Sequence, residues 1–183
     1  MDNFTVPSDG FSNIGGVASF WFSPINKVQS IPDINSTQRA ISDPVTWRDG
    51  GEWLKGYSTF RQCKLSIRSG FGPNGKNFDA ELTGFYPGLD TIMSDLLEEM
   101  QGQEFIILAL DHEGNQLLLG SIDEPMIFTL KEWNSSDVGQ GMKGYAFAFA
   151  RKFSKRPPFY LPTPETSALG IGAMAIGSTF KVY

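Results

Sequence analysis

Reactive side chains are scarce in this sequence of 183 residues, which contains one histidine and one cysteine. His112 lies between two acidic residues at an expected turn tip, and we interpret it as a solvated turn residue rather than a general acid or base. Cys63 shares strand parity with Leu65 and Ile67, which is typical of a small buried hydrophobe rather than a nucleophile. A lone cysteine also excludes an intramolecular disulfide.

Paired carboxylates, metal ligands and phosphate-binding loops are the next signals of chemistry. Glu98 and Glu99 are adjacent, so on a helix their side chains point to different sides and cannot act as an acid–base pair. Either they form a solvated face, or cations of a neighbouring subunit meet them near the negative end of the helix. The sequence has no zinc-ligand spacing, calcium loop or glycine-rich nucleotide motif. We therefore predict that the protein is not an enzyme and uses no cofactor and no metal.

One amphipathic helix, expected over residues 89–101, and the strand after it organise the chain. The apolar residues of this helix repeat at the spacing of a single buried face. They are Leu89, Ile92, Met93, Leu96, Leu97 and Met100. Residues 105–110 are apolar at both parities, which predicts a strand covered on both faces. A turn over residues 111–115 then returns the chain into a second strand over residues 116–120.

A β-hairpin is expected around a glycine-rich loop, residues 69–76, which contains the turn residue Asn74. Both flanking segments alternate apolar and polar residues, as half-buried strands do. The outward positions predict charge pairs across the two strands. These positions are Asp79 and Glu81 on one strand, and Lys64 and Arg68 on the other.

The segment over residues 145–150 has the most regular alternation. Its aromatic positions are expected to fill a core, and its alanine positions would let another backbone or helix approach closely. The aromatic residues are Tyr145, Phe147 and Phe149, and the alanines are Ala146, Ala148 and Ala150. A basic patch that begins with Arg151 and Lys152 follows this strand.

The composition favours a β-rich fold, because 13% of the residues are aromatic and 20 glycines and 11 prolines supply turns. We predict a mainly β (α+β) fold: a β-sandwich or partly closed β-barrel of about seven or eight strands, with the helix packed on it. One domain is expected over residues 14–160, with a long loop over residues 32–57, between an N-terminal arm (1–13) and a C-terminal extension (161–183). No run of about 18 apolar residues occurs, so we expect no membrane span.

Two non-enzymatic functions fit these features. The first is self-assembly, in which the long loop, the arms, the alanine row and the charged patches are surfaces for identical neighbours. The second is a carbohydrate- or ligand-binding β-sandwich that uses Trp47, Trp53 and Trp133 as stacking platforms.

Several motifs between residues 14 and 160 resemble those of tail proteins of tailed bacteriophages, especially Bacteroidetes-type phages and prophages. The similar features are Ile14-Gly15-Gly16-Val17 before an aromatic strand, Asn74-Gly75 before Phe78, the helix over residues 89–100, Gly114-Asn115 with Leu117-Leu118-Leu119-Gly120, Gly144-Tyr145 with Phe147 and Phe149, and Pro158-Phe159-Tyr160. The resemblance implies a tail tube protein that forms rings of six copies, stacked around a channel for DNA. Residues beyond 161 are not part of the pattern.

The expected partners are therefore copies of the chain and other tail or neck proteins, and the expected location is the virion tail after synthesis in the host cytoplasm. The net charge of −5 fits a wall past which DNA slides without adhering. The expected assembly contacts are Trp47, Trp53, Phe71, Asn74, Glu98, Glu99, Ala146, Ala148, Ala150, Arg151 and Lys152. A tail terminator or head–tail connector, which also forms β-rich rings, is the alternative within this class.

Overall fold

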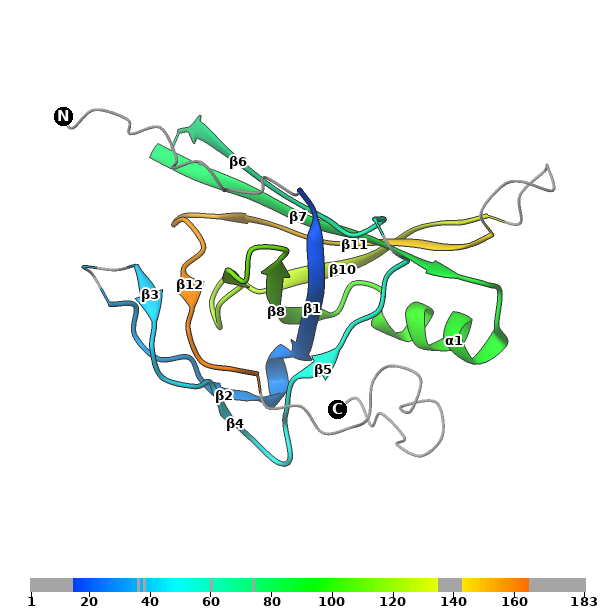
Figure 1. Cartoon of the computed structure of the whole chain (residues 1–183), viewed down its shortest axis with the longest axis horizontal. Helices are drawn as coiled ribbons and strands as arrows, with labels where there is room; N and C mark the ends of the chain where they lie inside the picture. The colour runs from blue at the N-terminus through cyan, green and yellow to red at the C-terminus, as the bar shows by residue number, and fades with distance from the viewer. Residues whose placement is uncertain are drawn as a thin grey trace.

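The computed structural model describes residues 15–164 apart from 36, 38, 60, 74 and 135–142 (Figure 1). The expected N-terminal arm and residues 165–183 of the expected extension lie outside the described residues. The elements are β1 Val17–Pro24, the 3-10 helix η1 Ile25–Lys27, β2 Val28–Ser30, β3 Ala40–Ile41, β4 Thr46–Trp47, β5 Leu54–Lys55, β6 Lys64–Gly72, β7 Gly75–Pro87, α1 Thr91–Met100, β8 Glu104–Asp111, β9 Gln116–Leu119, β10 Met126–Asn134, β11 Gly144–Phe153 and β12 Phe159–Tyr160.

Strand β8 is the branch point of a ten-stranded sheet. Antiparallel β1 pairs along one edge of β8, whereas β10 and β9 follow one another along the other edge. The sheet continues from β10 through β11 and β7 to β6, and from β9 through β12 to β3. Each residue from Phe105 to Ala109 is at most 2% exposed, which confirms the expected strand with two covered faces.

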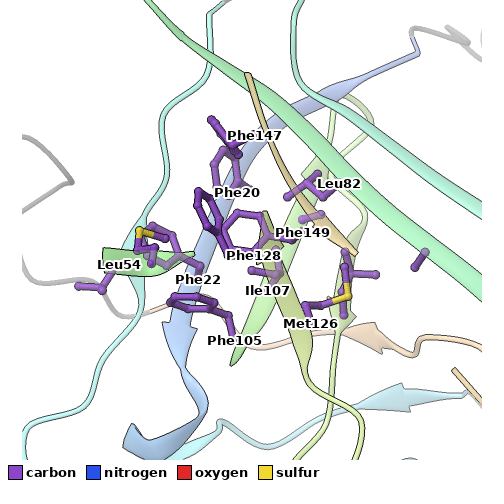
Figure 2. Close-up of a cluster of buried hydrophobic side chains, with 14 of the residues drawn as sticks. Phe20, Phe22, Leu54, Leu82, Phe105, Ile107, Met126, Phe128, Phe147 and Phe149 are labelled. Atoms are coloured by element: carbon purple, nitrogen blue, oxygen red, sulfur yellow. The ribbon is translucent and has the colours of Figure 1, made fainter. Parts of the chain in front are cut away.

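An aromatic core fills the space between β1–β8 and the strands β10, β11 and β7 (Figure 2). Phenylalanines from four strands contact one another there, including Phe22 with Phe105 at 5.8 Å and Phe128 with Phe149 at 5.0 Å between ring centroids. Alternation along each strand sends these large side chains inward. The result is a sandwich-like β fold with one helix, as predicted.

A second core lies on the opposite face of β8. Ile106 and Leu108 project there, and the segment after β2 covers them with Ile41, Val45 and Trp53. The segment expected as a loop over residues 32–57 therefore carries three strands of two residues each, β3, β4 and β5. They pair with β12, β2 and β1, respectively. This segment is therefore ordered by pairing with distant strands, which no local sequence pattern predicts.

Helix α1 closes one end of the aromatic core with Met93, Leu97 and Met100. It begins at Thr91, two residues later than expected, because Asp90 is its N-cap and its side chain accepts a hydrogen bond from the Ile92 N–H. Leu89 and Ile92, expected on the buried face, are 39% and 51% exposed. Two apolar side chains, one just before the helix and one in its first turn, are therefore exposed to solvent.

The β6–β7 hairpin is confirmed, but its strands extend through most of the loop expected over residues 69–76. Pairing continues to Gly72 opposite Gly75, so only two residues connect the strands. The glycines serve packing as well as turning, because a Cβ at Gly70 or Gly72 would lie 2.9 Å from the Asn77 side chain. The hairpin is thus a long two-stranded ribbon.

Candidate assembly surfaces

The alanine row of β11 lies on the outward face of the sheet, between β10 and β7. Ala146 and Ala150 are half-buried, but Ala148 is 0% exposed. An ion pair of 3.4 Å joins Lys131 of β10 to Glu81 of β7 and has to pass over β11, where the short alanines leave room for it. Ala148 is therefore already covered, and its expected role as an assembly contact is wrong.

Asp79 and Glu81 form ion pairs on this face with partners other than those expected. Asp79 contacts Lys152 of β11 at 3.6 Å, and Glu81 contacts Lys131. Arg68 does lie opposite Asp79 in register, but the ion pairs run the other way across the sheet, to Lys152 of β11 and Lys131 of β10. All four side chains are about half exposed, so each pair contributes about 0–1 kcal/mol.

Arg151 and Lys152, expected as one basic patch, point to opposite faces of β11. Lys152 lies opposite Asp79 on the outward face, whereas Arg151 lies opposite Ala80 on the face that carries the core. Successive strand residues alternate between faces, so the two side chains leave the strand in opposite directions. Arg151 and Lys152 nevertheless both line one open depression of about 470 Å³, together with Arg68.

Trp47 and Trp53 lie in the second core. Trp53 is 2% exposed, and its ring meets Trp47 edge-on at 5.2 Å and Tyr160 at 6.2 Å. The expectation that Trp53 is an assembly contact or a sugar platform is therefore wrong, and Trp47 is half-buried against it. Trp133 is 66% exposed and alone keeps the geometry of a platform among these three residues.

The tip of the hairpin exposes Phe71, which is 89% accessible. Phe71 lies opposite Lys76 on the same ribbon face as Phe78, whose ring Lys76 approaches at 5.2 Å. Asn74, expected as a contact beside it, lies outside the described residues. The structure leaves Phe71 accessible, and its expected role as an assembly contact stays a prediction.

Glu98 and Glu99 are both exposed in the last turn of α1, which carries no basic residue. Negative side chains at this end face the negative end of the helix dipole. Their proposed contact with a neighbour's cations remains a prediction.

An open groove of about 720 Å³ was missed in the sequence. Residues 31–34, 120–124 and 153–158 line it, and Ile34 and Ile122 are 43% and 50% exposed within it. One wall is held by Glu124, whose carboxylate accepts hydrogen bonds from the Ser154 N–H and hydroxyl. No local sequence pattern indicates that these three segments lie together in the fold. The isolated isoleucines in polar loops could, however, have indicated an exposed apolar surface.

The groups considered for chemistry occupy structural positions. Burial raises the pKa of the Cys63 thiol to about 12, so a thiolate is scarce at neutral pH. Partial burial raises the pKa of Asp111, but hydrogen bonds from the side chain and N–H of Asn115 and from the N–H groups of Glu113 and Gly114 outweigh this effect, and the pKa is lowered. His112 is exposed in the same turn, as expected.

Comparisons with protein-family models, with curated proteins and with solved structures found no match to this chain. Within the described ranges, no helix is long and apolar enough to cross a membrane. The same residues contain no group of three or more His, Cys, Asp or Glu side chains arranged to hold a metal ion.

Proposed function

We propose that the protein is a structural subunit of a bacteriophage tail, a tail tube protein whose copies form rings that stack around a channel for DNA. The observation that carries the proposal is the open edge of β6. This strand of nine residues ends the sheet, with β7 along one edge and no described strand along the other. A long unpaired edge is a template for pairing with another chain.

Ring formation removes such an edge. When β6 of one copy joins a different surface of the next, the contact is heterologous, and a heterologous contact whose rotation closes gives a ring. The resemblance to phage tail proteins supplies the expected number of six copies. The net charge of −5 favours passage of DNA over adhesion.

Electron microscopy of the purified full-length chain tests the proposal. Stacked rings with an axial channel would support a tail tube protein. Single rings would instead favour the alternative of a tail terminator or head–tail connector. Monomers at every concentration would refute all three.

Hydrogen exchange tests the role of the β6 edge separately. In the monomer, we expect rapid exchange at the amides of residues 64–72 that point away from β7, because no described strand bonds them. We expect these amides to become protected in assembled protein, whereas amides of the internal strand β8 are protected in both states. Unchanged exchange at β6 in assembled rings would show that the edge does not form the contact.

The alternative of another class, a carbohydrate- or ligand-binding module, loses two of its three expected platforms, because Trp53 and Trp47 pack in the second core. A strict monomer that is retained on a sugar column through Trp133 would favour it over assembly.

A further inference from the structure

The large exposed apolar side chains of the described residues gather at the two ends of β11. Seven of the eight belong to two groups (the eighth is Leu161). We call Tyr57, Leu89, Ile92 and Trp133 the helix-end patch. The hairpin-end patch combines two separate features of the other end, Phe71 at the hairpin tip and the groove residues Ile34 and Ile122. Figure 1 shows the two ends, with α1 on the right and the tip of the hairpin on the left.

The helix-end patch is built around Tyr145, near the start of β11. Trp133 lies opposite Tyr145 on β10, and Tyr86 lies opposite it on β7. Tyr57 contacts the Tyr86 ring edge-on at 5.9 Å. The Tyr145 hydroxyl donates to the Asp90 carbonyl oxygen at 3.4 Å, which places the flanking apolar residues of α1 beside this aromatic row.

The hairpin-end patch lies at the other end of β11. Phe153, the last residue of β11, pairs with Phe78 and lines the groove that contains Ile34 and Ile122. Beyond Phe78 no third strand of the described residues pairs with the ribbon, so Phe71 continues the core-facing side of the hairpin past the described elements that cover it. The ten residues of β11 separate the two patches by roughly 30 Å.

We infer that the two patches bind each other between copies of this chain, so that the hairpin end of one copy packs on the helix end of the next. The inference deepens the proposed function and rests on it for its setting, because it names the surfaces through which rings would stack. Two unlike patches at opposite ends are both covered by one heterologous contact, whereas a two-fold contact covers only one of them.

Charge favours the same pairing. Around the helix-end patch, the side chains of Asp90, Asp95, Glu98 and Glu99 are all exposed. Contact between two helix ends would therefore bring like charges together, which is unfavourable. The hairpin end offers the exposed cations Lys76, Lys155 and Arg156, together with the acidic residues Asp33 and Asp123 on the groove. Because positive and negative side chains are mixed at the hairpin end, it repels the acidic helix end less than a second helix end would.

Sedimentation velocity of the full-length chain tests the inference with two variants, Phe71→Ser and the double variant Ile92→Ser/Trp133→Ser. The three side chains are 89%, 51% and 66% exposed, so the folded monomer should tolerate their loss. We expect each variant to raise the dissociation constant for self-association at least about tenfold. Leu161→Ser, which removes an apolar side chain that is 58% exposed outside both patches, should assemble as the unmodified chain does.

Mixing the two variants distinguishes the modes of contact. Each retains the patch that the other lacks, so an equimolar mixture should regain one patch-to-patch contact between the two species that neither variant makes alone, whereas any contact through the β6 edge is the same in all samples. No gain in association on mixing would show that the two patches do not bind each other and would overturn the inference. Equal weakening by Leu161→Ser, or a monomeric unmodified chain at all concentrations, would also overturn it.

The outcomes separate the inference from the proposed function. If both variants form normal tubes, the two patches are not the stacking surfaces, but the tail tube proposal is unaffected. A gain in association on mixing, with open filaments and no rings from the unmodified chain, would support the assignment and refute the tube.

Discussion

Replacing Phe149 by alanine tests whether the aromatic core holds the two layers together. Phe149 is 1% exposed and lies at the centre of the cluster in Figure 2. Its ring contacts, at centroid distances of 5.0 to 6.4 Å, are with Phe20, Phe22, Phe105, Phe128 and Phe147. These partners come from β1, β8, β10 and β11, so the substitution opens a cavity that no single strand can close.

The expected loss of unfolding free energy is about 4–5 kcal/mol. Truncation of a buried phenylalanine to alanine costs about 3–5 kcal/mol, and aromatic pairs contribute about 0.5–1.5 kcal/mol each beyond burial. Because five rings surround Phe149, the upper part of the range applies.

Urea unfolding of dilute, monomeric protein, followed by tryptophan fluorescence, measures the effect. With a denaturant slope of about 2 kcal/mol per molar, the midpoint should fall by about 2 M. Phe71→Ala makes the same chemical change at a side chain that is 89% exposed, and it should shift stability by less than about 0.5 kcal/mol.

A loss below about 2 kcal/mol at Phe149, or equal losses at Phe149 and Phe71, would refute the two-layer packing. If Phe149→Ala does not fold, Phe149→Leu keeps part of the volume, and it should cost about 1–2 kcal/mol under the same conditions.

Four further predictions follow from the described contacts and the expected arms. Ala148→Leu should lower stability by about 1–3 kcal/mol by overfilling a covered site, and an unchanged melting temperature would contradict this. Asp90→Ala removes the N-cap of α1 and should cost about 1 kcal/mol in urea unfolding, whereas Asp90→Asn should retain most of it. Because the pKa of Asp111 is lowered in the fold, its stabilising contribution should be complete above the unfolded pKa and be lost as the pH falls through the lower folded pKa; an NMR titration with a midpoint at or above the ordinary aspartate value would contradict this. Deleting residues 1–13 or 161–183 should leave a folded subunit that polymerises poorly, and normal tubes from both truncations would refute a role for the arms.

Local patterns in the sequence predicted much of the fold. Residues 105–110 are apolar at both parities, and β8 is covered on both faces by two different cores. Alternation placed Phe147 and Phe149 in the core and Ala148 on the outer face, as the register shows. Such patterns are readable because each depends on neighbours two to four residues apart.

The candidate surfaces were harder to predict, because exposure depends on what folds over a residue. Trp53 was expected at the surface, but it packs against Tyr160 from the far end of the domain. Val45 donates its N–H to the hydroxyl of that tyrosine, 115 residues away in the chain. Ala148 was expected to be open, but the ion pair between Lys131 and Glu81 passes over its strand.

The sequence by itself determined the longer strands, the approximate position of the helix and which side of those strands is apolar, since these follow from spacing along the chain. Only the tertiary structure decided that the short strands of residues 40–55 pair with distant partners, that the ten-stranded sheet branches at β8, and that two unlike apolar patches lie at opposite ends of β11. Which strands pair in a sheet depends on packing between distant segments, and the periodicity of one segment alone does not reveal its partner.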